Sequence, residues 1–130
     1  MDGYEQLATM MKALAHPVRL QILRVLRREE ACVCHLEAVL GQRQAYISQH
    51  LMKLRDSGLV VDRREGLNVF YALSDDTITT LLDAAYSTAE DIKGQAMRLD
   101  HATGTEVGCT CPKCQPESAT EGQLRPQEAI

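Results

Sequence analysis

The chain has 130 residues, and its 18 Asp and Glu outnumber its 14 Lys and Arg, which gives a formal net charge of −4 at pH 7. This length predicts one domain with a tail. Because no run of about 18 or more apolar residues exists, we expect no transmembrane helix. The N-terminal segment is acidic and lacks the apolar stretch of a secretory signal, so we expect a cytoplasmic protein without a membrane partner.

Two amphipathic helices are predicted at the start of the chain. In the first, residues 4–14, apolar side chains recur at helical spacing along one side. Pro17 suits the first position of the second helix, where its missing N–H is not needed. The apolar side of the first helix has Tyr4, Leu7, Met11 and Leu14, and the predicted buried stripe of the second has Val18, Ile22, Val25 and Leu26.

Residues 32–59 predict a short helix, a tight turn at Gly41 and a longer helix that stops at Gly58. The longer helix has a buried stripe formed by Ile47, Leu51 and Leu54. Its opposite face and flanks carry polar side chains that can bind base edges or phosphates, as a helix-turn-helix requires. The candidate DNA-binding residues on this helix are Gln44, Tyr46, Ser48, Gln49, His50 and Lys53.

A β-hairpin is predicted directly after this helix, with strands near residues 60–62 and 68–72. Arg63 and Arg64 are expected at its tip, where they would bind phosphates or the minor groove. The ordered set of helix, turn, polar-faced helix and basic hairpin predicts a winged helix-turn-helix, a mainly α fold. Between residues 43 and 64, five basic residues against two acidic ones give a local charge of +3, so the acidic excess lies elsewhere.

A last helix is predicted from Ser74, a favourable N-cap, with an apolar stripe that continues to Leu99. The first and last helices have more apolar surface than so small a domain can cover. We therefore expect them to pack across a two-fold axis and form a homodimer. The alternative is that the last helix folds back on its own domain. A dimer would present two recognition helices about 34 Å apart to double-stranded, palindromic operator DNA.

Residues 101–130 predict a flexible tail attached to a DNA-binding and dimerisation domain of residues 1–100. The tail is rich in Gly, Pro, Ser, Thr, Gln and Glu and cannot bury enough apolar surface to fold alone. It nevertheless has three cysteines within six residues, which packing does not explain. The five cysteines thus form two clusters, Cys32 with Cys34 and Cys109 with Cys111 and Cys114.

Clustered cysteines in a cytosolic protein indicate metal binding or thiol redox chemistry rather than structural disulfides. Thiolates select soft ions such as As(III), Sb(III), Cd(II), Pb(II) or Zn(II). Residues two apart on a regular helix point about 200° apart, so Cys32 and Cys34 can share an ion only at a distorted helix start. The nine residues before Cys109 span up to about 30 Å, so the tail is long enough to supply further ligands.

Four segments together resemble the ArsR/SmtB family of bacterial metal-responsive repressors. They are AHPVRLQIL at 15–23, CVCHL at 32–36, ISQHLMKL at 47–54 and GLV at 58–60. The resemblance covers about residues 4–100. It implies a dimeric winged-helix protein that represses a resistance or efflux operon and releases DNA when its inducer binds. The Cys-Val-Cys sequence resembles the arsenic-sensing and the cadmium- and lead-sensing branches.

The chain also departs from those branches. Arsenic sensors have a third cysteine where this chain has Glu37, and cadmium and lead sensors add cysteines from an N-terminal arm, whereas residues 1–12 contain none. The family has a second metal site on its last helix, but no histidine follows Asp83 within that helix here. The tail cysteines could replace the missing ligands, with three sulfurs for As(III) or four for Cd(II), Pb(II) or Zn(II).

The sequence therefore predicts a repressor that binds operator DNA as an apo dimer and releases it when a thiophilic ion binds cysteine thiolates. No organic cofactor is expected. A thiol-redox or persulfide-sensing repressor of the same fold is one alternative, and a thiol- or metal-handling protein that does not bind DNA is another. We expect a non-enzyme, because no nucleophile–base pair or glycine-rich phosphate loop has motif support.

Overall fold

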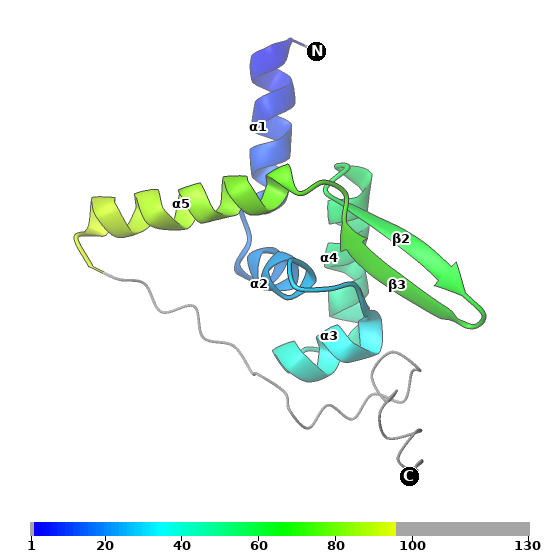
Figure 1. Ribbon diagram of the computed structural model, residues 1–130. Coiled ribbons are helices and arrows are strands. Elements are labelled where there is room, and N and C mark those ends of the chain that lie inside the picture. Colours follow the sequence, from blue (N-terminus) through cyan, green and yellow to red (C-terminus); the bar gives the residue numbers. More distant parts are fainter. Residues whose placement is uncertain (1, 96–130) are drawn as a thin grey trace.

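The structure is a computed structural model that describes residues 2–95, and these residues form five helices and three strands (Figure 1). None of the helices in this part of the chain is long and apolar enough to cross a membrane. The elements are α1 Gly3–Leu14, α2 Pro17–Leu26, β1 Ala31–Cys32, α3 Val33–Leu40, α4 Gln44–Asp56, β2 Val60–Glu65, β3 Asn68–Leu73 and α5 Thr77–Lys93.

Helices α1 and α2 begin where side chains bind their first backbone N–H groups. The Asp2 carboxylate accepts a hydrogen bond from the Glu5 N–H at 2.8 Å, and Glu5 accepts one from the Asp2 N–H at 3.0 Å, which makes a capping box. At α2, Nδ1 of His16 accepts from the Val18 N–H at 3.1 Å, and Pro17 holds the first helical position. The predicted start of α2 is confirmed.

Helices α3 and α4 form the predicted helix-turn-helix. Gly41 ends α3 in the left-handed conformation, with φ of 66°, which glycine adopts without steric cost. Ile47, Leu51 and Leu54 of α4 are fully buried, and α4 packs against α2, α3 and the hairpin. Each such side chain contributes about 1.5–3 kcal/mol on burial. The hydrophobic core therefore fixes the position of α4.

The core lies between α2, α3, α4, the sheet and the start of α5. In α2, Ile22 and Leu23 have no exposed surface, whereas Val25, which we predicted to be buried, is only partly buried. From α5, Ile78 and Leu82 complete the core. One contiguous cluster thus holds the helix-turn-helix against the sheet.

The sheet has three antiparallel strands rather than the two predicted. Their order is β1-β3-β2, and β1 pairs its Cys32 with Phe70 of β3. A two-residue strand has no periodic pattern, so the sequence alone did not indicate it. The hairpin strands are also longer than predicted, because their pairing extends from Val60 opposite Leu73 to the turn.

The last helix is predicted to begin at Ser74, but α5 begins at Thr77. The Ser74 hydroxyl instead donates to the carbonyl of Gly58 at 2.6 Å, which links the chain after β3 to the end of α4. Asp76 precedes the first turn of α5, and Gly94 ends the helix with φ of 72°. The predicted apolar stripe runs on to Leu99, which lies outside the described residues.

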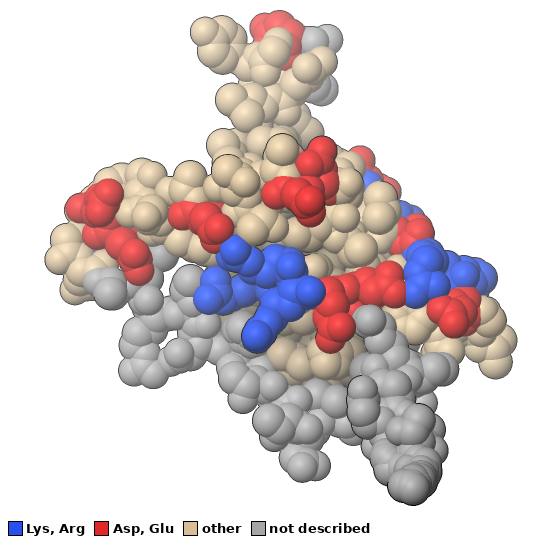
Figure 2. Space-filling model, in the orientation of Figure 1, with Lys and Arg blue, Asp and Glu red and all other residues tan. Residues whose placement is uncertain are grey.

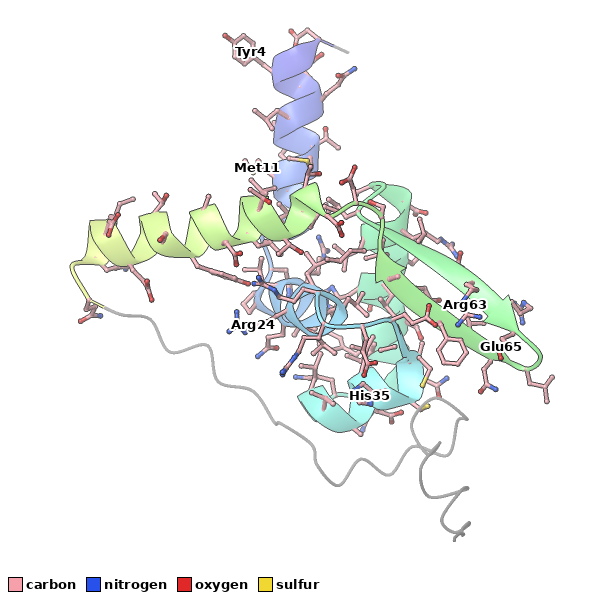
Figure 3. The ribbon with its side chains drawn as sticks, in the orientation of Figure 1. Tyr4, Met11, Arg24, His35, Arg63 and Glu65 are labelled. Carbon is pink, nitrogen blue, oxygen red and sulfur yellow. The ribbon has the colours of Figure 1, made fainter. Side chains whose placement is uncertain are left out.

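Helices α1 and α5 both extend beyond the core. Figure 1 shows α1 standing away from the other helices and α5 reaching out past α2. Tyr4, which points away from the body of the molecule in Figure 3, is 87% exposed, and Ile92 near the end of α5 is 78% exposed. Within residues 2–95, both helices thus leave large apolar side chains uncovered.

Candidate functional site

The exposed face of α4 carries most of the side chains that we predicted to meet DNA. Gln44, Gln49 and Lys53 are exposed, and Tyr46 is 37% exposed, whereas Ser48 is half-buried. The exposed amide groups can donate to and accept from base edges, and the ammonium group can bind a phosphate. Their contact with DNA stays a prediction.

His50, which is predicted to contact DNA, lies on the buried side of α4 and not on this exposed face. Its side chain is 6% exposed, because it shares the buried side of α4 with Ile47 and Leu54. Nδ1 accepts a hydrogen bond from Nε of Arg19 at 3.1 Å, and the buried Nε2 has no hydrogen-bond partner among residues 2–95. Burial, followed by the nearby charges of His16 and Arg19, lowers the pKa of His50. The neutral ring therefore positions α4.

Arg19 and His50 connect α4 to the two helices before it. Nη1 of Arg19 donates to the carbonyl of Ala13 near the end of α1, at 3.2 Å. The His50 ring lies 4.3 Å from the His16 ring and meets the Tyr46 ring edge-on at 4.6 Å, centroid to centroid. The first turns of α4 are thus fixed relative to α1 and α2.

Arg63 and Arg64 are predicted at the tip of the hairpin, but the structure places them elsewhere. Both are within β2, which pairs with β3 as far as Glu65, and the two-residue turn is Gly66 and Leu67. Gly66 has φ of 63°, and Leu67 is 98% exposed. The tip of the wing is therefore apolar, and the two arginines lie along its edge.

Two carboxylates hold the Arg63 guanidinium. Nη2 pairs with Oε1 of Glu30, Nε donates to Oε2 of the same residue at 3.3 Å, and Nη1 donates to Oε1 of Glu65 at 2.7 Å. Figure 3 shows Arg63 and Glu65 together on the hairpin. The guanidinium also lies 4.9 Å from the centroid of the Phe70 ring. Hydrogen bonds to Glu30 and then Glu65 raise the pKa of Arg63 and keep its guanidinium protonated. The two carboxylates nevertheless give this part of the wing a lower net positive charge than predicted.

The sulfur atoms of Cys32 and Cys34 converge at the junction of β1 and α3. Cys32 is predicted at the start of the helix, but it is the last residue of β1. Its backbone is extended, with φ of −86° and ψ of 167°. Its side chain therefore does not follow the helical rotation, and its Sγ lies 2.8 Å from Sγ of Cys34. Cys32 is buried and Cys34 is partly buried. The distorted helix start that a shared ion requires is present.

A complete metal site is not formed within residues 2–95. No group of three or more His, Cys, Asp or Glu side chains in this range is placed to hold one ion. Two sulfurs suit a thiophilic ion but leave its coordination incomplete. The three predicted ligands from the tail, Cys109, Cys111 and Cys114, lie outside the described residues.

Asp83, the residue that remains of the second family site, is engaged by Arg27 of α2. The two guanidinium nitrogens Nη1 and Nη2 donate to its two oxygens at 2.6 and 3.0 Å, which lowers the pKa of Asp83. Figure 2 shows basic side chains gathered next to α5 on this face. They border a hollow of about 630 Å³ between α2 and α3, lined by Arg24, Val25, Arg27, Arg28, Glu29, Ala31, His35 and Val39.

Comparison with known proteins identifies the family. A family model described as bacterial regulatory protein, arsR family, matches residues 16–61. A biofilm growth-associated repressor from Agrobacterium fabrum is 42% identical over 82 residues, which are 63% of this chain and 70% of that protein. The chain belongs to the ArsR family. A transcriptional repressor SmtB homolog from Synechocystis is 40% identical over 81 residues, which are 62% of this chain and 61% of the homolog.

The predicted winged helix-turn-helix is confirmed by a solved structure that is described as a possible ArsR-family transcriptional regulator. The homodimeric winged helix-turn-helix DNA-binding domain of Mb0332 from Mycobacterium bovis superposes with a TM-score of 0.65 and 30% identity, over 73% of this chain and 89% of that one. The residues that match the ArsR model extend from the start of α2 into β2 and include the cysteine pair and α4. Both relatives named above are repressors, which agrees with a regulator rather than an enzyme.

Sequence reasoning missed two residues that position these ArsR elements. Glu30 binds Arg63 although the two are 33 positions apart, and Arg19 binds His50 across 31 positions. Side-chain contacts between residues that are distant in the sequence leave no periodic signal. The one available hint was that His50 falls on the same helical stripe as Leu54, where a polar side chain needs a partner.

Proposed function

We propose that this ArsR-family chain is a dimeric repressor that releases its operator when Cys32 and Cys34 bind a thiophilic ion. The observation that carries the proposal is the 2.8 Å separation of their two sulfur atoms. Metalloid and heavy-metal ions such as As(III), Sb(III), Cd(II) and Pb(II), and also Zn(II), prefer thiolate ligands. Such an ion would supply bonds to sulfur that fix the end of β1 to the first turn of α3.

Operator binding is assigned to the exposed face of α4 and to the wing. Helix α3 packs against α4, so a change in the first turn of α3 alters the support of the recognition helix. Gln44 and Gln49 are placed to bind base edges, and Lys53 to bind a phosphate. Tyr46 and Ser48 flank that face. Arg63 and Arg64 provide the wing contact.

Dimerisation is assigned to α1 and α5. Their exposed apolar side chains would be covered if the two helices packed on a second copy, and Mb0332 is described as homodimeric. A dimer presents two α4 helices to the two halves of a palindrome. The cysteines Cys109, Cys111 and Cys114 are proposed as the remaining ligands of the ion, from the same or the partner chain.

Ion binding and DNA binding then oppose each other through one equilibrium. The ion-free dimer holds α4 and the wing in the geometry that binds DNA, and the ion-bound dimer holds them differently. A coupling of about 3 kcal/mol would weaken operator binding about 150-fold. By linkage, the operator weakens ion binding by the same factor.

A titration of operator-bound full chain tests the proposal. Fluorescence anisotropy should report DNA release on addition of arsenite, antimonite, Cd(II), Pb(II) or Zn(II), whichever is the inducer. Cys32→Ser and Cys34→Ser should each bind the operator as wild type does but fail to release it. The control is the combined substitution of Cys109, Cys111 and Cys114 by Ser, which should weaken ion binding without altering ion-free DNA affinity. Release by both single variants would refute the assignment.

A thiol-redox repressor is the second candidate, because two sulfurs this close can also react with an oxidant or a polysulfide. The two candidates differ in reversibility. Release caused by an ion should reverse on chelation with no change in protein mass. Release caused by peroxide or polysulfide should reverse only with a reductant, and mass spectrometry should show the modified cysteine.

A further inference from the structure

Arg63 and Cys32 lie in one row across the three-stranded sheet. Cys32 of β1 pairs with Phe70 of β3, and Phe70 pairs in turn with Arg63 of β2. Residues directly opposite each other in antiparallel strands project from the same face of the sheet. The guanidinium accordingly lies over the Phe70 ring, on the side of the sheet where Cys32 is buried.

Glu30 connects the two ends of this row, because its carboxylate reaches from the β1 side of the sheet to Arg63 on β2. It precedes β1 and is two residues from Cys32, yet both of its carboxylate oxygens bind Arg63 on the far strand. A bidentate carboxylate is the partner that matches the planar guanidinium best. The segment that contains the cysteine pair therefore directly contacts a wing arginine.

The charge around Arg63 opposes DNA binding in this arrangement. One guanidinium is surrounded by two carboxylates, from Glu30 and Glu65, which leaves a local charge of −1. Figure 2 shows acidic side chains among the basic ones on the hairpin side of the molecule. All three side chains are partly exposed, so a phosphate that approached would be repelled by the carboxylates. Release of Glu30 would therefore make Arg63 a stronger ligand for a phosphate.

The pair is also easy to exchange. Exposed ion pairs contribute little to stability, because water and salt screen them. A DNA phosphate presents an anionic oxygen group of similar geometry to a carboxylate, so it can replace Glu30 on the guanidinium. β1 has only two residues and pairs with β3 at two positions, Ala31 opposite Tyr71 and Cys32 opposite Phe70.

We infer that Glu30 competes with a DNA phosphate for Arg63, and that the cysteine pair sets the outcome of this competition. The inference rests on the proposed function, because it assumes that the wing binds DNA. When Cys32 and Cys34 are joined through a common ligand, the segment before α3 is fixed and Glu30 stays on Arg63. When they are not joined, a DNA phosphate can displace Glu30 and bind Arg63.

The first test needs no ion. Operator affinity of the ion-free full chain is measured by anisotropy at several salt concentrations, on a duplex selected by the chain from a random pool. Glu30→Gln should bind about 3-fold tighter than wild type, since removal of an exposed partner frees the guanidinium. The slope of its operator affinity against salt concentration, plotted as logarithms, should be steeper by about one released counterion for each wing. In an Arg63→Gln background the same change should have no effect.

The second test uses Glu65→Gln as the matched control. Glu65 binds the same arginine but lies on the hairpin, away from the cysteine segment. Both variants should tighten ion-free binding. The fold-release is the factor by which arsenite or Cd(II) weakens operator binding. Only Glu30→Gln should reduce it, because Glu65 does not lie on the segment that contains Cys32. Thermal melts of both variants verify that they are folded.

The outcomes separate this inference from the proposed function. Unchanged or weaker ion-free affinity of Glu30→Gln, or a gain that persists without Arg63, overturns the competition. Equal fold-release in Glu30→Gln and wild type overturns the link to the cysteines. If no ion releases the wild-type chain, the proposed ion response fails, and the ion-free comparison still decides whether Glu30 competes for Arg63.

Discussion

The recognition helix α4 and the hairpin wing are held in place by different forces. Helix α4 is anchored by Ile47, Leu51 and Leu54, each with no exposed surface. In β2 only Val60 is buried, and the outer part of the strand is held by backbone pairing and by ion pairs of Arg63. Burial of apolar surface contributes strongly to stability, and no solvent ion can replace it. Exposed ion pairs contribute little, and another anion can replace the carboxylate.

This difference indicates where a signal can act at low energetic cost. Moving α4 by itself would open the core, so a change in its position must involve the helices that support it. Moving the wing arginine requires only that its two carboxylate partners, Glu30 and Glu65, yield, and both are partly exposed. The cysteine pair lies between the two regions, on the segment that leads from Glu30 to α3. Substitutions in each region should therefore differ in both the size and the kind of their effect.

The largest effect is expected in the core of α4. Leu51→Ala should lower the free energy of unfolding by about 2–5 kcal/mol, because it leaves a cavity in a closely packed site. The matched control is the neighbouring Met52→Ala on the exposed face of the same helix, where the change should stay within about 0.5 kcal/mol. Urea unfolding at one fixed chain concentration measures both. Equal losses would show that α4 is not held by this stripe.

A smaller effect, on DNA affinity alone, is expected on the exposed face of α4. Gln49→Ala should cost about 1–3 kcal/mol on the preferred operator and relax the choice of base at one position in each half-site. Lys53→Ala should weaken binding on all sequences alike and reduce the salt dependence. Binding to a panel of mutated operators separates the two patterns. If both variants lose affinity uniformly, α4 does not read bases through Gln49.

A moderate, pH-dependent effect is expected at the buried polar contact of α4. The pKa of His50 is lowered from 6.5 in the folded chain, so the unfolded chain binds more protons as the pH falls below about 6.5. The contribution of the neutral His50 to the free energy of unfolding should therefore be fully present above that pH and should decline as the pH falls. His50→Gln, which cannot titrate, should show a flatter decline in the same urea experiment. Identical pH profiles would exclude His50 as the group responsible.

The smallest effect is expected at the base of the wing. Arg55 and Asp62 form an ion pair at 3.2 Å, and both side chains are more than a third exposed. Asp62→Asn should change the free energy of unfolding by less than about 1 kcal/mol. The shift should diminish at high salt because the pair is screened. A loss comparable to that of Leu51→Ala would contradict the contrast between helix and wing.

Much of the fold could be predicted because its signals are local. The helical spacing of Ile47, Leu51 and Leu54 predicts the buried side of α4, and Gly41 predicts the turn before it. The hairpin follows from two β-prone runs around a glycine. The family model and the Mb0332 structure confirm this architecture.

The remaining features depend on contacts between residues far apart in the sequence. His50 falls on the buried stripe by its spacing, but its polar chemistry suggested a DNA contact. The strand at Cys32 exists only because β3 pairs with it, and two residues alone do not indicate a strand. The partner of Arg63, Glu30, comes from a different part of the chain. Which ion binds, and the part played by the tail cysteines, stay predictions.

The reciprocal measurement tests the central claim most directly. Ion affinity of the full chain is measured from thiolate–metal absorption, once with free protein and once with operator-bound protein. The operator should weaken ion binding by the same factor by which the ion weakens operator binding, and this factor should fall to about one in Cys32→Ser. An ion affinity that is the same with and without operator would show that the cysteine pair does not control DNA release.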